Sequence, residues 1–168
     1  MAIHKNAGSR FFISPTAIDP DQFEGITDTA AVALFAAILD WVEVEEIEDF
    51  GELGDSAESV TFTAVGNARV RKLKGPKDAG TQTITVGRDP LDDGQQALID
   101  AEGEDFHYPF KVELKDARTP DHSNSVLYYA GMVMAKPTNL GNVSNVVRRS
   151  FPIGINTGVY EVASAETP

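Results

Sequence analysis

GPKDAGTQTITVGRDPLDDGQQALIDA, residues Gly75–Ala101, is the stretch from which the fold can best be read. It opens with residues typical of a turn, Gly75, Pro76, Asp78 and Gly80. The β-branched residues that follow predict a strand over Thr81–Val86, which ends at Gly87. A turn leading into a strand is therefore the first half of this stretch.

The second half of the stretch predicts a helix. Asp89 is a suitable N-cap, Pro90 fits the first helical position, and further aspartates follow in the first turn. Gly103 is a typical C-terminal stop. We therefore expect a helix over about residues 90–101.

Working outward, most of the chain has the pattern of β-strands. We expect strands at Arg10–Ser14, Trp41–Val44, Val60–Val65, Ala68–Leu73, Tyr108–Lys115, Val126–Met134, Val143–Ile155 and Val159–Val162. Gly66–Asn67 predicts a hairpin turn, and Phe50–Ser59 has the composition of a long polar loop. The phase of the alternation shifts at Glu45–Glu46, which indicates a bulge or an exposed edge.

The sequence predicts a second helix and an apolar strand that a helix could cover. Apolar spacing predicts a second, shorter helix at about residues 29–39, capped by Asp28 or Thr29, and a buried strand is the competing interpretation. Val126–Met134 is apolar at almost every position and should be covered on both faces. The helix at 90–101 could cover the second face through Leu91, Leu98 and Ala101.

These elements predict a mainly β fold: an antiparallel β-sandwich or small barrel flanked by the helix at 90–101, with the second helix at 29–39. The 168 residues suffice for one domain, expected at 10–162, between a flexible arm (1–9) and a polar tail (163–168). Because no apolar h-region or membrane-length apolar run is present, we expect no membrane insertion and synthesis in a cytosol.

Composition and charge exclude several classes of function. There are no cysteines, so a disulfide scaffold and a cysteine zinc site are excluded. The net charge of −12, from 26 acidic and 14 basic residues, would repel a nucleic-acid backbone. Conventional nucleic-acid binding is therefore disfavoured, although repulsion itself would suit a surface that DNA must pass without adhering.

Residues able to carry catalysis or to bind a metal do not form a recognisable pattern. His4, His107 and His122 lack metal-ligand spacing. The segment 89–100 resembles a calcium loop only faintly, because Leu91 stands at a ligand position. Asp121, His122, Ser123 and Ser125 lie in one polar turn, whereas serine catalysis needs groups from different segments. We expect no enzyme activity, no cofactor and no metal.

Two blocks of opposite charge are more informative. Asp40–Glu58 holds nine acidic residues and no basic one, and Arg69–Lys77 holds five basic residues and no acidic one. Both could be ordinary solvated faces. Alternatively, the basic block of one copy meets the acidic block of the next, and such a head-to-tail contact closes into a ring or extends as a filament.

Several of these segments together resemble one known family. They are Trp41–Val44, FGELGDSAESV at Phe50–Val60, GPKDAGTQTITVGRDPLDDGQQAL at Gly75–Leu98, VLYYAGMVM at Val126–Met134 and GNVSNVVRRSFPIGINTGVYEV at Gly141–Val162. In this order they resemble the tail tube (major tail) proteins of bacteriophages with long non-contractile tails. The resemblance extends over residues 12–162, almost the whole chain.

The resemblance implies a structural virion protein. Six copies would form a ring, and rings would stack into a tube through which genomic DNA passes during ejection into the host. It also implies tape measure and tail tip or terminator proteins as partners, with assembly in the host cytoplasm. A tail-completion or baseplate ring protein of related fold, or a monomeric β-sandwich binding module, are the alternatives.

Carried onto this sequence, the resemblance makes Phe50–Ser59 a candidate inter-ring stacking loop and residues 66–80 a second interface region. The candidate interface residues are Phe50, Glu52, Leu53, Asp55, Glu58, Arg69, Arg71, Lys72, Lys74 and Lys77.

Overall fold

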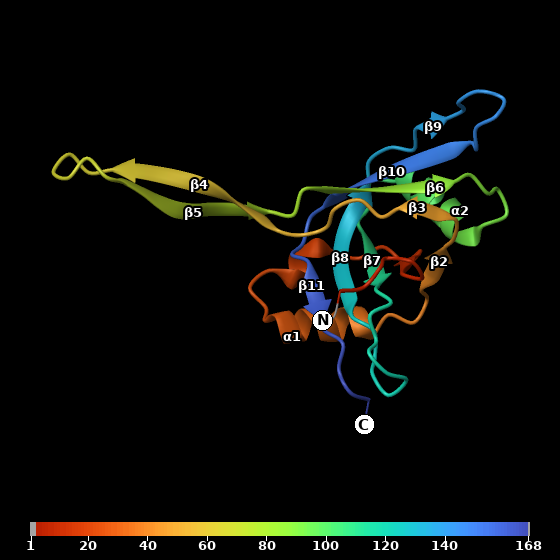
Figure 1. Ribbon diagram of the computed structural model, residues 1–168, viewed down its shortest axis with the longest axis horizontal. Helices are drawn as coiled ribbons and strands as arrows, with labels where there is room; N and C mark the ends of the chain where they lie inside the picture. Colours follow the sequence, from red (N-terminus) through yellow and green to blue (C-terminus); the bar gives the residue numbers. More distant parts are fainter. Residues whose placement is uncertain (1–2, 168) are drawn as a thin grey trace.

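The computed structural model describes residues 3–167, so the expected terminal segments 1–9 and 163–168 lie partly outside the described residues. A nine-stranded antiparallel sheet forms the body of the molecule (Figure 1). Its strands are β1 (Arg10–Ile13), β2 (Val42–Val44), β3 (Ile47–Asp49), β6 (Thr81–Gly87), β7 (Tyr108–Glu113), β8 (Val126–Val133), β9 (Thr138–Asn139), β10 (Arg148–Ile155) and β11 (Tyr160–Val162). A separate two-stranded sheet contains β4 (Ser56–Thr63) and β5 (Val70–Asp78).

The main sheet curls over its own core. Its principal order is β2-β1-β7-β8-β10-β6-β3, while β8 pairs with β11 through its first half and with β10 through its second. Ile84 of β6 and Phe151 of β10 are fully buried in one cluster with Phe110 of β7 and Tyr129 of β8. The two halves of the sheet thus enclose a common core, which confirms the predicted sandwich or barrel-like fold.

Helix α2 (Asp93–Glu102) confirms the expected helix but begins later than expected. Its N-cap is Asp92 and not Asp89, because the Asp92 carboxylate accepts hydrogen bonds from two backbone N–H groups, Gly94 in the helix and Glu45 beside β2, both at 2.9 Å. The Asp89 carboxylate instead accepts the N–H of Leu91 in the preceding turn. Asp92 therefore fixes the helix to the sheet as well as capping it.

The packing of α2 was predicted only in part. Leu98 and Ala101 are buried in the main core as expected, but Leu91 is 89% exposed and contacts no core residue, so that assignment was wrong. Gly94 lies where a Cβ atom would stand 2.1 Å from the carbonyl oxygen of Glu43. Only glycine lets the helix approach β2 this closely.

Helix α1 (Asp28–Ala36) confirms the helical interpretation and excludes the buried strand. Its N-cap is Thr27, one residue before the expected pair, because the Thr27 hydroxyl accepts the N–H of Ala30 at 3.3 Å. Phe35 packs with Phe23 of the short 3-10 helix η1 (Pro20–Phe23) and with Tyr128 of β8. This second cluster shows that α1, and not α2, covers the face of β8 opposite the main core (Figure 1).

The β4–β5 hairpin is longer than the sequence predicted. Residues 56–59, expected in a loop, belong to β4, and Gly75 and Pro76, expected in a turn, belong to β5. Gly75 and Pro76 both lie opposite Glu58, which makes a β-bulge in the pairing of β4 with β5. At a bulge the missing backbone N–H of Pro76 interrupts no regular ladder hydrogen bond. The turn before β6 is reduced to Ala79 and Gly80, whose φ is +70°.

The strand predicted over Val143–Ile155 begins only at Arg148. Residues 140–147 form the connection from β9, and Val143 is fully exposed, so it does not share the buried face of Phe151, Ile153 and Ile155. The phase shift expected near Glu46 is present: Glu46 has φ +55° between β2 and β3, which separates the two short edge strands.

Candidate assembly interface

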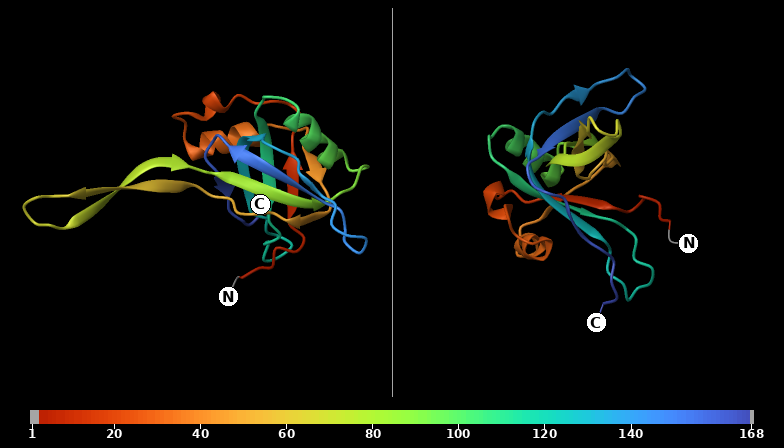
Figure 2. Two further views of the ribbon diagram at one scale, coloured as in Figure 1. Left: turned by 90° about the horizontal axis from the view of Figure 1, so that it is seen from above. Right: turned by 90° about the vertical axis from the view of Figure 1, so that its left-hand side faces the viewer.

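The β4–β5 hairpin, with its turn, projects from the body as an arm (residues 56–78). Figures 1 and 2 show it extending from one end of the molecule in perpendicular views. Every residue of β4 is exposed, and in β5 only Gly75 is half-buried. Because an isolated two-stranded hairpin is at best marginally stable in water, a long arm with no core of its own is suited to binding another surface.

The pairing register gives the arm two different faces. Val60 lies opposite Leu73 and Phe62 opposite Arg71, and directly paired side chains share one face. Val60, Phe62 and Leu73 are 46%, 54% and 61% exposed. The other face pairs Thr61 with Lys72 and Ser59 with Lys74. We call the first the apolar face and the second the lysine face of the arm.

The predicted basic residues divide between these faces. Arg71 lies on the apolar face beside Phe62, whereas Lys72, Lys74 and Lys77 lie on the lysine face. Arg69 precedes the first residue of β5 and lies next to the turn. Three ion pairs occur within residues 3–167, and none includes a cation of the arm. These five charges are therefore available to a partner.

The sequence prediction missed the apolar face itself. Val60 and Phe62 alternate along β4, but they join Leu73 in one surface only once the register across the hairpin is known. The signal that could have found them is the alternation of apolar and polar residues in two strands separated by a glycine-containing turn.

The predicted stacking segment around Phe50 is mainly a joint between arm and body. Phe50 and Leu53 are half-buried and pack against the main core, and the Phe50 carbonyl accepts a hydrogen bond from the buried Gln82 side chain at 2.8 Å. Gln82 in turn accepts the hydroxyl hydrogen of Tyr129. Glu52 and Asp55 are exposed, and Glu58 lies within β4.

The acidic block Asp40–Glu58 is not a single free surface. Arg10 and Glu43 form an ion pair at 2.6 Å, and its hydrogen bond holds the pKa of the Glu43 carboxyl below its usual value. Arg148 pairs with Glu48 across β10 and β3. The hydroxyls of Thr16 and Ser14 donate to Asp40 at 2.6 and 2.7 Å, which likewise lowers the pKa of Asp40. Several of the nine carboxylates thus form ion pairs or hydrogen bonds within their own subunit.

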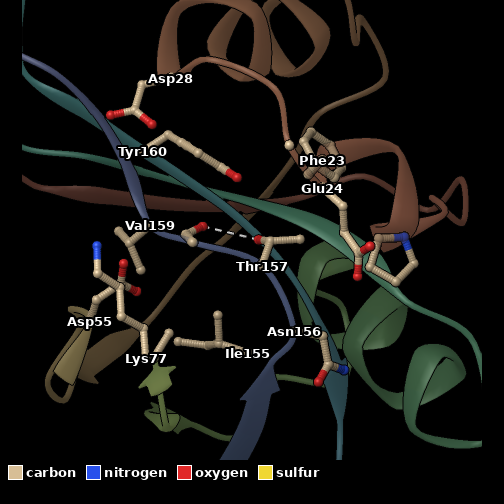
Figure 3. A pocket seen from close by; sticks show the side chains of 14 residues that line it. Phe23, Glu24, Asp28, Asp55, Lys77, Ile155, Asn156, Thr157, Val159 and Tyr160 are labelled. Atoms are coloured by element: carbon tan, nitrogen blue, oxygen red, sulfur yellow. Dashed lines mark hydrogen bonds between the residues drawn. The ribbon is translucent and has the colours of Figure 1, made fainter. Parts of the chain in front are cut away.

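A cleft of about 710 Å³ lies between the base of the arm and the η1–α1 region. Figure 3 shows Asp28 and Tyr160 on one side and Asp55 with Lys77, from the arm base, on another. Burial, together with the negative charges of Asp28 and Asp55, raises the pKa of Tyr160. The cleft is open and mainly polar, and its lining includes no histidine or serine that could act as a base–nucleophile pair.

The side chains considered for catalysis have structural partners. Ser123 donates its hydroxyl hydrogen to the carbonyl of Ala165, and Ser125 donates to Asp116. His122 is hydrogen-bonded through Nδ1 to Thr119 at 2.8 Å, and within residues 3–167 neither serine bonds to it. These bonds tie the C-terminal residues 163–167 to the loop 121–125.

Over the same described residues, no group of three or more His, Asp or Glu side chains could hold a metal ion. Nor does any helix there have the length and apolar character needed to cross a membrane.

Trp41, the single tryptophan of the sequence, is half-buried. Its ring packs beside Tyr128, and the Lys111 ammonium lies 5.1 Å from the Trp41 ring centroid and 4.2 Å from that of Phe12. Burial lowers the pKa of Lys111. Trp41 therefore contributes to packing beneath α1 and does not present an open aromatic face.

Comparison with known proteins agrees with this architecture. No protein-family model matches the sequence, and no curated protein sequence is similar to it. The chain is similar in structure to the SPP1 tail tube, with TM-score 0.60 and 14% identity over 95% of this chain and 78% of that chain. It is also similar to a chain of the anti-feeding prophage baseplate, with TM-score 0.63 and 7% identity over 92% of this chain and 91% of the other.

The chain therefore has the fold of tail-tube-type proteins, as the sequence resemblance predicted. At these identities the similarity establishes the fold and not the function. The features that can indicate a function in this chain are the exposed arm and the distribution of its charges.

Proposed function

We propose that this protein is a structural subunit of a phage tail tube, in which six copies form a ring and rings stack into a conduit for genomic DNA. The observation that carries the proposal is the arm, which exposes Val60, Phe62 and Leu73 on a hairpin without a core, together with five cations that form no ion pair within residues 3–167. The tail-tube fold over nearly the whole chain supports it.

A head-to-tail assembly follows from the position of the arm. Eight residues of β4, at about 3.3 Å each, carry the turn roughly 25 Å beyond the base of the arm. In the structure this paired hairpin points away from its own body, so we assign its partner surface to another copy. Because arm and partner surface are different regions of one chain, the contact is heterologous and generates a closed ring or an extended stack.

The proposed interface includes Glu52, Asp55 and Glu58 at the arm base and Arg69, Arg71, Lys72, Lys74 and Lys77 along the arm. Phe50 and Leu53 contribute by holding the arm base against the main core. The tape measure and tail tip or terminator proteins implied by the sequence resemblance are proposed as further partners, and the assembled virion tail as the location.

The net charge of −12 suits the passage of DNA without adhesion. Arg10 and Arg148 are both engaged by glutamates, so part of the body's positive charge is already neutralised within the subunit. A mainly negative wall repels phosphates over about 8 Å at physiological ionic strength. The proposed role is passive and requires no catalysis.

A second candidate, a single baseplate or tail-completion ring, is favoured by one observation. The similarity to the anti-feeding prophage baseplate chain covers 91% of that chain, compared with 78% for the SPP1 tail tube chain. Such a protein would form one closed ring and would not extend further.

Light scattering and negative-stain electron microscopy of the purified chain over a range of concentrations test the proposal. Tubes with six-fold rings in cross-section are expected. Rings that never stack would favour the second candidate, and a monomer at every concentration would contradict both.

A further inference from the structure

Helix α1 has an unusual exposed surface. Asp28 and Thr29 are its only polar residues, and its remaining residues are alanine, valine, leucine and phenylalanine. Ala31 and Phe35 face the body, while Ala30, Ala33 and Leu34 are exposed, as is Ala37 at the C-cap. A helix that is apolar on all sides is normally buried on all sides. One side of α1 is therefore left without a partner in the single chain.

We propose that the outer face of α1 is the docking surface for the apolar face of the arm from a second copy. This inference rests on the proposed self-assembly and names the surface that receives the arm. Val60, Phe62 and Leu73 of one copy would cover Ala33, Leu34 and Ala37 of the next. The small alanine side chains allow the flat hairpin to approach the helix closely, and Leu34 supplies the apolar area.

Charge complementarity favours the arm as the partner of the outer face of α1. Every charged side chain between Arg10 and Arg69 is a carboxylate, and four of them, Asp19, Asp21, Glu24 and Asp28, lie in η1, beside it or at the start of α1. The apolar face of the arm carries Arg71, and Arg69 follows towards the turn. The acidic residues lie towards the N-terminal end of α1 and the arginines towards the tip of the arm, so charges of opposite sign accompany the two apolar areas and favour this pairing.

The same charges disfavour the two competing contacts. Packing α1 against α1 of a second copy would bring two acidic η1 regions together, which like-charge repulsion opposes. The acidic edge at β2–β3 offers Glu45 and Glu46 to the arm, but its strands expose no large apolar side chain to cover Phe62. An exposed apolar residue close to this edge is Val146, on the loop before β10, beside Gly87.

Cross-linking tests this placement directly because the chain has no cysteine. Leu34→Cys and Leu73→Cys are introduced together, and the protein is treated with a short bis-maleimide under assembly conditions. Both side chains are exposed, so the substitutions should leave the fold intact, which circular dichroism checks. We expect a ladder of covalent oligomers beyond the dimer, because each copy contributes one site to each of two contacts.

The single variants and a second pair serve as controls. Leu34→Cys alone and Leu73→Cys alone should give at most dimers. Leu73→Cys with Val146→Cys tests the competing acceptor near β2–β3. A ladder from that pair and not from Leu34 and Leu73 would overturn the inference, as would normal tubes in which neither pair cross-links. If the unsubstituted chain stays monomeric, the proposed function fails together with the inference.

A charge exchange provides a second, independent readout. Arg71→Glu or Glu24→Lys alone should raise the concentration needed for assembly about tenfold, and the double variant should restore most of the loss. Lys72→Glu is the matched control, since Lys72 neighbours Arg71 but lies on the lysine face. Adding Glu24→Lys should not restore assembly of the Lys72→Glu variant. Equal rescue of Lys72→Glu and Arg71→Glu would show that the arm does not dock through its apolar face.

Discussion

The apolar face of the arm should control assembly without contributing to the stability of the subunit. We consider the triple variant Val60→Ser, Phe62→Ser and Leu73→Ser. These side chains are 46%, 54% and 61% exposed, so about half of each remains to be buried by a partner. Full burial of such a side chain is worth about 1.5–3 kcal/mol, so the unburied half of the three together supplies roughly 2–4 kcal/mol per contact.

Since 1.4 kcal/mol corresponds to a factor of ten, the critical concentration for assembly should rise by about 30- to 1000-fold. Sedimentation of assembled from free protein at several total concentrations measures it. The thermal unfolding midpoint of the monomer should stay nearly unchanged, because no core contact is removed.

Leu91→Ser is the matched control. Leu91 is 89% exposed but lies in the turn before α2, far from the arm, and its substitution should leave assembly unaltered. An unchanged critical concentration in the triple variant would refute the reasoning, because it would show that the apolar face stays in water in the assembled state.

Three further predictions concern the subunit itself. Phe35→Ala should cost about 3–5 kcal/mol of unfolding free energy, measured by urea denaturation, because it empties the centre of the cluster that holds α1 on β8. Asp92→Ala should cost about 1–3 kcal/mol by the same measurement, since it removes the α2 cap and leaves the N–H of Glu45 without its acceptor, whereas Asp89→Ala should cost less. The pKa of Asp40 is lowered in the folded state by hydrogen bonds from Thr16 and Ser14, so its contribution is present at neutral pH and is lost as pH falls below about 4. Thr16→Ala with Ser14→Ala should therefore weaken the loss of stability on acidification, and an unchanged pH profile would exclude this role for Asp40.

Local patterns predicted most of the body of the protein. The alternation in β7 and the capping residues near α2 identified those elements, because both signals depend on neighbours close in sequence. The predicted N-cap of α2 was three residues too early, because the Asp92 carboxylate also accepts a hydrogen bond from the backbone N–H of Glu45, which is distant in sequence. That tertiary contact leaves no trace in the local sequence.

The arm shows more clearly what the local sequence cannot predict. Gly75 and Pro76 have the composition of a turn, yet the ladder with β4 keeps them in a strand by means of a bulge at Glu58. Strand alternation alone places Arg71 on the opposite face from Lys72 and Lys74, and the structure confirms this division. Which residues of β4 share each face follows from the register and could not be derived from spacing. Likewise, the outer face of α1 can be recognised as unpartnered only when the side that packs on β8 is known.

Cryo-electron microscopy of the assembled protein is the most direct test of the central claim, that copies of this chain join through the arm into stacked rings. We predict six subunits per ring, rings stacked along a common axis, and each arm seated on a neighbouring copy with Phe62 buried against α1. A map in which the arms extend into solvent, or a sample containing only monomers at high concentration, would contradict it.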